Sequence, residues 1–404
     1  MKKKYGLVAL FLFFILGAPL QLFASYDLAS ERDKAIEWVT AQRHGFGWVA
    51  VNETSNTGYT YDNALAVIAY TGAGDTTHAK DLLNFLQAHQ LTDGCWYDSM
   101  NQTTGAGVSL ARSSGNQAWV VYAVCFYALR SGDNTFLPMA ERASAWIIAR
   151  QEADGGVTGG LNADGSERTW ASTEHNVDSY FAFKLLDYVR PTPSYEAASE
   201  GCKNWLLQTA WNIGEGRFNR GANDPVMVLD ANSLGALFLK DIQDSVRFGS
   251  VLSHIENTYS LTTTRRRGHR ITTYTGFKDK VEDEYGFGRH WQEGTEQMAV
   301  VYLRDGQAQD GTFYNEEIIK SDDPAFGVGH SDDDNDGDGG KQYYLTGTAQ
   351  SGLIEQPSSG LWQIFAANET LGDRPKIFFP IPDGNVVHHQ KNIYEQQGPH
   401  GLRE

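Results

Sequence analysis

Residues 115–151, GNQAWVVYAVCFYALRSGDNTFLPMAERASAWIIARQ, carry the pattern on which the fold prediction depends. The first half is apolar and rich in small residues on all sides, which is typical of a fully buried helix. The turn sequence SGDN follows at 131–134. The second half places apolar residues at helical spacing and leaves one polar face. The stretch therefore predicts a helical hairpin with one buried and one amphipathic helix.

The same hairpin pattern recurs along most of the chain. Similar stretches lie at 61–89, 174–211, 229–259, 291–307 and 356–372, and an unpaired helix is predicted at 29–42. No convincing run of alternating strand residues separates them. Repeats of this size indicate a closed or stacked array of helix pairs. Six pairs, with an unpaired helix that can complete a ring, favour an all-α fold, the (α/α)6 toroid, over an open solenoid.

Polar clusters recur where the buried helices are predicted to begin. They are Tyr61-Asp62-Asn63, Gly115-Asn116-Gln117, Glu174-His175-Asn176, Asp230-Ala231-Asn232 and Gln292-Glu293-Gly294. In a toroid these helix ends meet at one mouth, where the positive ends of the helix dipoles favour carboxylates. The clusters therefore predict a polar floor in a central cavity. Asp62, Asn116 and Asp230 could equally be ordinary helix caps, so both interpretations stay open for them.

The cluster EHNVD at 174–178 is harder to explain by capping, because a cap needs one polar residue and this stretch has four. Glu174 and Asp178 are four residues apart and share a helix face. Glu293 and Glu296 are similarly placed three residues apart, beside Trp291.

The two ends of the chain differ from the repeats. Residues 1–24 have a basic start, a short apolar run and small residues before a plausible cleavage point, as in a secretory signal peptide. We therefore expect a secreted or periplasmic protein, with no membrane association beyond export. The toroid is predicted at 25–374. Residues 375–404 lack helical periodicity and are predicted to be a tail that packs on the toroid.

Composition excludes several classes of partner. The formal net charge is −17, and it becomes −20 without the three Lys of the signal peptide. This argues against binding to nucleic acid or to anionic membranes. The basic stretch RRRGHR at 265–270 is a local exception. Cys95, Cys125 and Cys202 lie in or beside apolar segments and are expected to be buried thiols.

Paired carboxylates in an aromatic-rich cleft are the groups that glycoside hydrolysis needs. One acid of raised pKa protonates the leaving oxygen, and a second carboxylate activates water or attacks the sugar. Glu174 is the predicted general acid and Glu293 its partner, with Asp62, Asp178 and Asp230 as further candidates for base or sugar anchor. Predicted sugar contacts come from aromatic, amide, imidazole and guanidinium side chains: Asn63, Trp96, Asn116, Trp119, Trp170, His175, Arg217, Asn219 and Trp291.

Several of these motifs together carry a family resemblance. TYDNALAVIAYTGAGD, GNQAWVVYA, STEHNVDSYFAF, LDANSLGALFL and EGTEQMAVVY resemble the six-hairpin glycosidases, over about residues 28–373. The resemblance rests on the repeat plan and on the acids at the helix starts. It implies action on an oligo- or polysaccharide, usually hydrolysis with inversion, and no organic cofactor. It does not identify the catalytic pair residue by residue.

The acidic run SDDDNDGDGG at 331–340 has a different pattern. Asp332, Asp334, Asp336 and Asp338 alternate and are followed by glycine, as in the first half of a Ca²⁺-binding loop. The glutamate that completes an EF-hand loop is missing. A structural Ca²⁺ ion or a solvated acidic loop both fit this stretch.

Three other functions remain open on the same fold. A polysaccharide lyase would use His175 and the basic stretch at 265–270 instead of two carboxylates. A non-catalytic protein would bind a glycan without cleaving it. A terpene-cyclase-like toroid is suggested by the turn at Asp93, although export and the lack of an Asp-rich motif on an inner helix argue against it.

Overall fold

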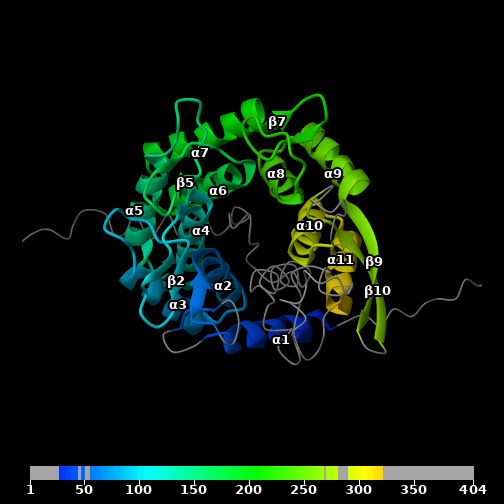
Figure 1. The fold of residues 1–404 in the computed structure, drawn as a ribbon, viewed down its shortest axis with the longest axis horizontal. Helices are drawn as coiled ribbons and strands as arrows, with labels where there is room; N and C mark the ends of the chain where they lie inside the picture. Colours follow the sequence, from blue (N-terminus) through cyan, green and yellow to red (C-terminus); the bar gives the residue numbers. More distant parts are fainter. Residues whose placement is uncertain (1–26, 44–46, 51–54, 268–269, 281–289, 322–404) are drawn as a thin grey trace, which may run out of the picture.

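The computed structural model describes residues 27–43, 47–50, 55–267, 270–280 and 290–321. Paired helices form a ring around a central space (Figure 1). The inner helices are α2 (Thr60–Gly72), α4 (Ser114–Ser131), α6 (Thr173–Val189), α8 (Leu229–Asp241) and α10 (Gln292–Asp305). The outer helices are α3 (Thr76–Ala88), α5 (Leu137–Ile148), α7 (Pro193–Trp205), α9 (Ser245–Tyr259) and α11 (Ala308–Ser321). Helix α1 (Leu28–Ala41) contacts α2.

The ring has the order that the sequence predicts. Each inner helix packs against the next one along the chain and against the outer helix that follows it. The ends of the series approach each other, because the Tyr61 hydroxyl of α2 donates to Glu293 Oε1 of α10 at 2.9 Å. This contact supports a ring rather than an open solenoid. The hairpins predicted at 61–89, 115–151, 174–211, 229–259 and 291–307 are confirmed, the last of them continuing through α11.

Short turns connect each inner helix to its outer helix. Gly74 and Gly132 follow α2 and α4 with left-handed backbone (φ +84° and +74°), where a side chain would be strained. Asp75 then caps α3 by accepting from His78 N at 3.0 Å, and Asp244 caps α9 by accepting from Arg247 N at 3.0 Å. The Gly and Asp residues in these loops therefore define where the helices end and begin.

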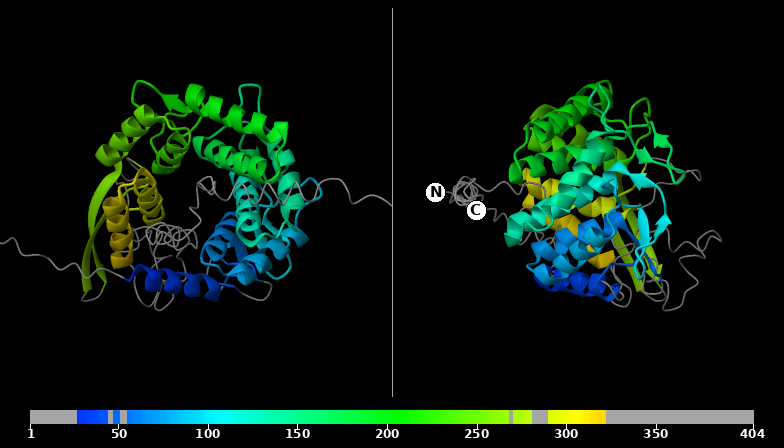
Figure 2. Two further views of the ribbon diagram at one scale, coloured as in Figure 1. Left: turned by 180° about the vertical axis from the view of Figure 1, so that it is seen from behind. Right: turned by 90° about the vertical axis from the view of Figure 1, so that its left-hand side faces the viewer.

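Short strands lie in the loops that lead to the inner helices, mostly on one side of the ring (Figure 2). They form the antiparallel sets β1 (Thr57–Tyr59), β2 (Ser99–Asn101) and β3 (Gly107–Ser109); β4 (Arg112–Ser113), β5 (Gly160–Leu161) and β6 (Glu167–Arg168); and β7 (Trp211–Asn212) with β8 (Arg217–Phe218). A longer hairpin joins β9 (Ser260–Arg267) to β10 (Arg270–Phe277), with Arg267 opposite Arg270. The expectation of no strand segments was wrong for the β9–β10 hairpin, where Thr-rich runs favour strands.

Each loop is fixed by an amide four positions into its inner helix. Asn63 accepts from Val49 N at 2.7 Å and donates to Val49 O at 3.0 Å. Gln117 does the same with Trp96, Asn176 with Val157, and Asn232 with Phe218. In α10 the hydroxyl of Thr295 accepts from Phe277 N at 3.0 Å. We call these residues the anchoring amides and hydroxyl. Their side chains are buried and bind backbone that would otherwise lack partners.

In α2, α4 and α6 the first residue of the inner helix binds the loop that leads to the next inner helix. Thr60 Oγ1 donates to Tyr97 O at 2.6 Å, Ser114 Oγ to Thr158 O at 2.7 Å, and Thr173 Oγ1 to Asn219 O at 2.5 Å. The starts of α2, α4 and α6 therefore each bind two consecutive loops. We call this side of the ring, with the inner helix starts and their loops, the mouth.

The core lies between the two rings of helices. Almost every residue of α4 is buried, including Trp119 and Phe126, as expected for an inner helix. Cys95, Cys125 and Cys202 are buried free thiols, which confirms the sequence prediction, and burial raises their pKa. Residues 1–24, the hairpin predicted at 356–372, the tail and Asp332, Asp334, Asp336 and Asp338 lie outside the described residues. Within the described ranges, none of the helices has the length and apolar character of a membrane span.

Candidate functional site

The acids predicted at the helix starts meet at the mouth. Asp62 at the start of α2 is buried near Glu293 at the start of α10. Burial, followed by the charge of Glu293, raises the pKa of Asp62 to about 8. Burial, then the charges of Asp230 and Glu293, also raises the pKa of Glu174 to about 8. Carboxyls from α2, α6, α8 and α10 therefore interact across one space.

Asp178 lies one turn after Glu174 on α6. Burial raises the pKa of Asp178 well above its usual range, and the charges of Glu174 and Asp230 add to this shift. A hydrogen bond from the Trp119 side chain lowers the pKa in part. The pKa of Asp230 is raised by burial in the first place. A backbone bond from Ala231 N at 2.7 Å and the charge of Arg220 lower it in part. Like charges that are buried together cannot all ionise, so the cluster holds protons at neutral pH.

Gly115 lets α4 and α6 approach at the mouth. An added Cβ there would lie 2.5 Å from His175 Cδ2 and 3.0 Å from Asp178 Oδ2. The His175 ring therefore lies over Gly115, between the two helices. Burial lowers the pKa of His175 to about 4, so its imidazole is neutral at neutral pH. On its other side, Trp170 lies 5.3 Å away between ring centroids and is 48% exposed.

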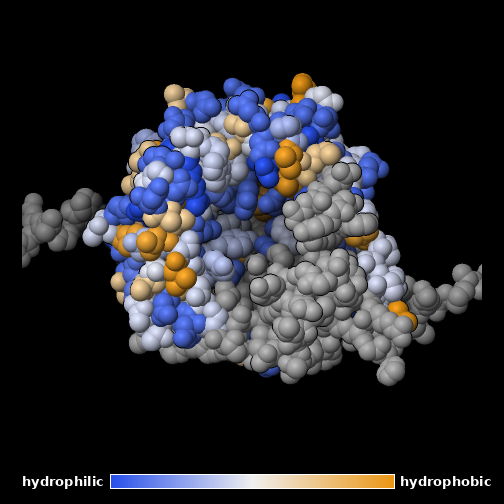
Figure 3. All heavy atoms as spheres, viewed as in Figure 1, coloured by the Kyte–Doolittle hydropathy of each residue, from blue (hydrophilic) through white to orange (hydrophobic). Residues whose placement is uncertain are grey.

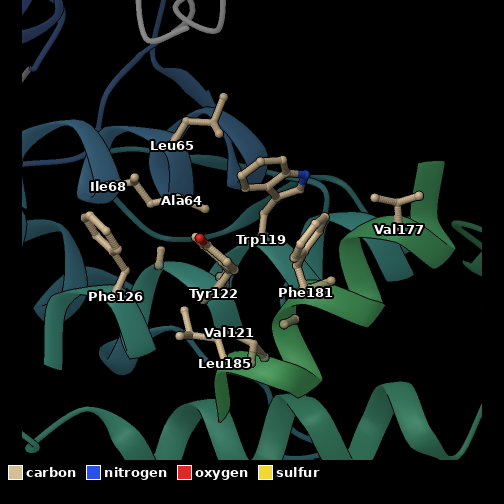
Figure 4. Packing of buried hydrophobic residues seen from close by; sticks show 14 of the residues in the cluster. Ala64, Leu65, Ile68, Trp119, Val121, Tyr122, Phe126, Val177, Phe181 and Leu185 are labelled. Atoms are coloured by element: carbon tan, nitrogen blue, oxygen red, sulfur yellow. The ribbon is translucent and has the colours of Figure 1, made fainter. Parts of the chain in front are cut away.

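A small pocket with room for about one water molecule lies between α4, α6 and α8. Its walls are mostly apolar and aromatic, and they are lined by Ala118, Trp119, Tyr122, Val177, Asp178, Phe181 and Leu234. Figure 4 shows Trp119, Tyr122 and Phe181 close together, with Val177 further along α6. The space-filling view shows a hollow near the centre of the ring (Figure 3). The acids thus stand beside a cluster of aromatic side chains that lines a small pocket.

The loops add a polar network that sequence reasoning missed. Asp98, after Trp96 and Tyr97, accepts from Asn116 Nδ2 at 2.9 Å and from Ser113 N at 2.6 Å. Arg168 donates to Ser113 Oγ at 2.8 Å, and its guanidinium lies 3.8 Å from Asp98. The charge of Asp98 also acts on His175. The signal available in the sequence was TDGCWYDSM at 92–100, a loop whose second Asp was not singled out.

The structure corrects three of the predicted sugar contacts. Asn63 is buried and its amide is used by Val49, and buried Trp96 donates its indole N–H to Leu86 O at 2.7 Å. Arg217 is 2% exposed and binds Phe218 O and Pro225 O. These three side chains are buried and hold the loops in place. Asn219 is partly buried, and its Oδ1 accepts from Arg217 within the same loop.

Other predicted residues lie where a ligand could reach them. Trp119 lines the pocket, Trp170 is exposed beside His175, and Asn116 is held by Asp98. Trp291 is partly buried and lies over Gly294, at the contact between α8 and α10. Glu296, paired with Glu293 in the sequence analysis, instead faces α11, where it accepts from Asn315 Nδ2 at 3.1 Å. Burial raises the pKa of Glu296 well above its usual range.

In the ranges that the structure describes, no group of three or more His, Cys, Asp or Glu side chains is arranged to hold a metal ion.

Comparison with known proteins shows the fold. No family model and no curated protein matches the chain. A glycosidase solved in complex with glucose matches with a TM-score of 0.65 and 11% identity, over 86% of this chain and 98% of the other. An α-amylase from Clostridium perfringens matches at 0.62 and 8% identity, over 84% and 97%. Cellobiose 2-epimerase from Spirochaeta thermophila matches at 0.66 and 12% identity, over 88% and 99%.

These similarities confirm the predicted architecture. The chain has the (α/α)6 toroid fold, which these glycosidases share with the sugar epimerase. At these identities the likeness shows the fold alone, so the reaction has to be argued from the mouth itself.

Proposed function

We propose that the protein is a glycoside hydrolase that cleaves an oligo- or polysaccharide with carboxyl groups at the mouth of the toroid. The observation that carries this proposal is the meeting of Asp62, Glu174, Asp178, Asp230 and Glu293 from four inner helices beside an aromatic pocket. Hydrolysis needs one protonated acid and one carboxylate on opposite sides of the bond. The signal peptide predicted at residues 1–24 supports a periplasmic or secreted location for this activity.

Glu174 is the proposed general acid. Its pKa of about 8 keeps the carboxyl protonated at neutral pH, as donation to the glycosidic oxygen requires. The bond between the anomeric carbon and that oxygen then breaks, and the oxygen leaves with the proton. Glu293 is the proposed base, which takes a proton from the attacking water. The Tyr61 hydroxyl, 2.9 Å away, orients the Glu293 carboxylate. Inversion at the anomeric carbon is the proposed outcome.

Fold similarity to an epimerase raises a different reaction. Epimerisation beside a carbonyl needs a base whose pKa lies near the working pH. His175, the histidine beside the carboxyls, has a pKa lowered to about 4, which makes it a weak base. The low pKa of His175 therefore argues against this histidine as the base of an epimerisation.

The test uses Glu174→Gln, which keeps the shape of the side chain and removes the acid. Glu196→Gln is the matched control, because Glu196 is exposed on the outer helix α7. Both variants and the wild type are incubated with a panel of polysaccharides, and the products are identified by reducing ends and by mass. We expect Glu174→Gln to lose activity by about 10²–10⁴-fold, with retained fold and ligand binding. Glu196→Gln should behave as wild type.

Each contrary result identifies an alternative. Near wild-type activity of Glu174→Gln removes Glu174 from the mechanism. Products that absorb as unsaturated uronates indicate a lyase. Binding of a glycan by the wild type without any product indicates a non-catalytic glycan-binding protein.

A further inference from the structure

Exposed apolar side chains recur just before the inner helices. Tyr59, Leu110, Trp170 and Val226 lie between one and four residues ahead of α2, α4, α6 and α8, and each is 44–48% exposed. Single exposed apolar residues are ordinary, but these four occupy a similar place in four consecutive hairpins. Because the inner helices start at the mouth, the four side chains belong to its edge. We call them the apolar rim.

Trp170 is the largest member of the apolar rim, and a glycine makes room for its indole. An added Cβ on Gly159 would lie 2.6, 2.6 and 2.7 Å from three consecutive atoms of the six-membered ring of that indole. Such nearly equal distances place Gly159 under the face of the ring rather than at its edge. The His175 ring lies at 5.3 Å between centroids and at an angle of 45°. With 48% of its surface exposed, Trp170 thus presents a supported aromatic surface to solvent.

Backbone hydrogen bonds hold Trp170 close to the start of α6. Trp170 O accepts from Gly159 N at 2.7 Å, and Thr173 N donates to Arg220 O at 2.8 Å. The chain is therefore bound to neighbouring loops at both ends of the short stretch 170–173. Glu174, the proposed general acid, is the next residue. The indole and the acid are thus held in a fixed relation to each other, as a preorganised binding site requires.

The order of the groups at the mouth indicates which sugar Trp170 would contact. A sugar ring has an apolar CH face that packs well on an aromatic ring. In the proposed reaction Glu174 protonates the oxygen that leaves, so the leaving sugar lies next to Glu174. We propose that Trp170 stacks against this leaving sugar, which makes the substrate an oligo- or polysaccharide rather than a glycoside of a small non-sugar group. The inference rests on the proposed function, because it uses Glu174 as the general acid.

The experiment compares two substrates that share one glycosyl unit and differ in the leaving group. Trisaccharides of glucose, galactose, mannose and xylose are each paired with the glycosyl fluoride of the same unit and anomeric configuration. A fluoride has no leaving sugar, so its hydrolysis does not use Trp170. For the pair that the wild type hydrolyses, we expect Trp170→Ala to lower kcat/KM for the trisaccharide by about 10-fold. The value for the fluoride should stay unchanged, which also shows that the variant is folded.

Two further variants separate stacking from other effects. Gly159→Ala places its new Cβ against the indole and should cause the same selective loss as Trp170→Ala. Phe313→Ala is the matched control, because Phe313 is an aromatic residue with 42% exposure on the outer helix α11. This control should hydrolyse both substrates as the wild type does.

The contrary outcomes differ for the two proposals. If Trp170→Ala loses activity on the trisaccharide and the fluoride equally, or on neither, the stacking role is overturned and the proposed function stands. Hydrolysis of a fluoride by the wild type without hydrolysis of any trisaccharide also overturns the stacking role alone. If the wild type hydrolyses neither kind of substrate, the proposed function and the inference fail together.

Discussion

Replacing Gly115 by alanine tests the packing that brings α4 and α6 together at the mouth. The new Cβ would lie 2.5 Å from His175 Cδ2 and 3.0 Å from His175 Nε2 and Asp178 Oδ2. Contacts this short force the two helices apart or displace the imidazole. Overpacking of this kind typically costs about 1–3 kcal/mol. Since alanine also regains part of the helix propensity that glycine lacks, we expect a net loss of about 1–2 kcal/mol.

Gly249→Ala is the matched control for this substitution. Gly249 is exposed on the outer helix α9, and no atom lies within 4 Å of an added Cβ. That variant should gain up to about 1 kcal/mol from helix propensity. Urea unfolding of both variants gives the two free energies of unfolding, and the expected shifts have opposite signs. Shifts of the same sign and similar size would show that His175 and Asp178 do not pack over Gly115.

Two further predictions concern the anchoring amides and the acids. Asn176→Ala leaves both backbone groups of buried Val157 without partners and should lower the free energy of unfolding by about 2–5 kcal/mol. The control Asn257→Ala, at an exposed position, should change the free energy of unfolding by less than about 0.5 kcal/mol. Equal effects of the two substitutions would contradict the anchoring role of Asn176. The folded-state pKa of Asp62 and Glu174 is raised from 3.8 and 4.5 to about 8, so the folded protein binds these protons more tightly than the unfolded chain. Thermal stability should therefore fall as pH rises from about 4 to about 8. It should fall less in the double variant Asp62→Asn, Glu174→Gln. An unchanged slope of stability against pH in that variant would refute the raised pKa values of the two acids.

The repeat pattern predicted the fold because each hairpin repeats the same contrast between a buried and an amphipathic helix. Helices α2 to α10 lie at the stretches where that contrast was found, whereas α11 lies just after the stretch predicted at 291–307. The hairpin β9–β10 was not predicted, because its Thr and Arg residues come in runs rather than in alternation with apolar residues that would mark a strand. Its position depends instead on contacts with α11, such as the bond from Thr275 N to Glu317 Oε2 at 2.6 Å.

The candidate site was predicted in part, and helix geometry explains where the prediction failed. All residues of each polar cluster were predicted to face the central cavity. Residues two positions apart on a helix differ in direction by about 200°. Glu174 therefore faces the mouth while Asn176 faces the loop behind it, and Asp230 and Asn232 divide in the same way. Acids at the first positions were correctly placed at the mouth, whereas the amide Asn63 was not.

The acids and the anchoring amides of the clusters have different roles, and the amides help the folded mouth to tolerate the acids. Raised pKa values mean that the ionised carboxyls are disfavoured in the folded state, so the acids oppose folding at neutral pH. On α6 the amide of Asn176 supplies two buried hydrogen bonds to Val157, and the first residue, Thr173, supplies another to the next loop. Residues 173–178 thus contain both the acids that oppose folding and the groups that hold the loops of the mouth in place. A rigid frame of this kind is needed if buried carboxyls are to keep their positions before a substrate arrives.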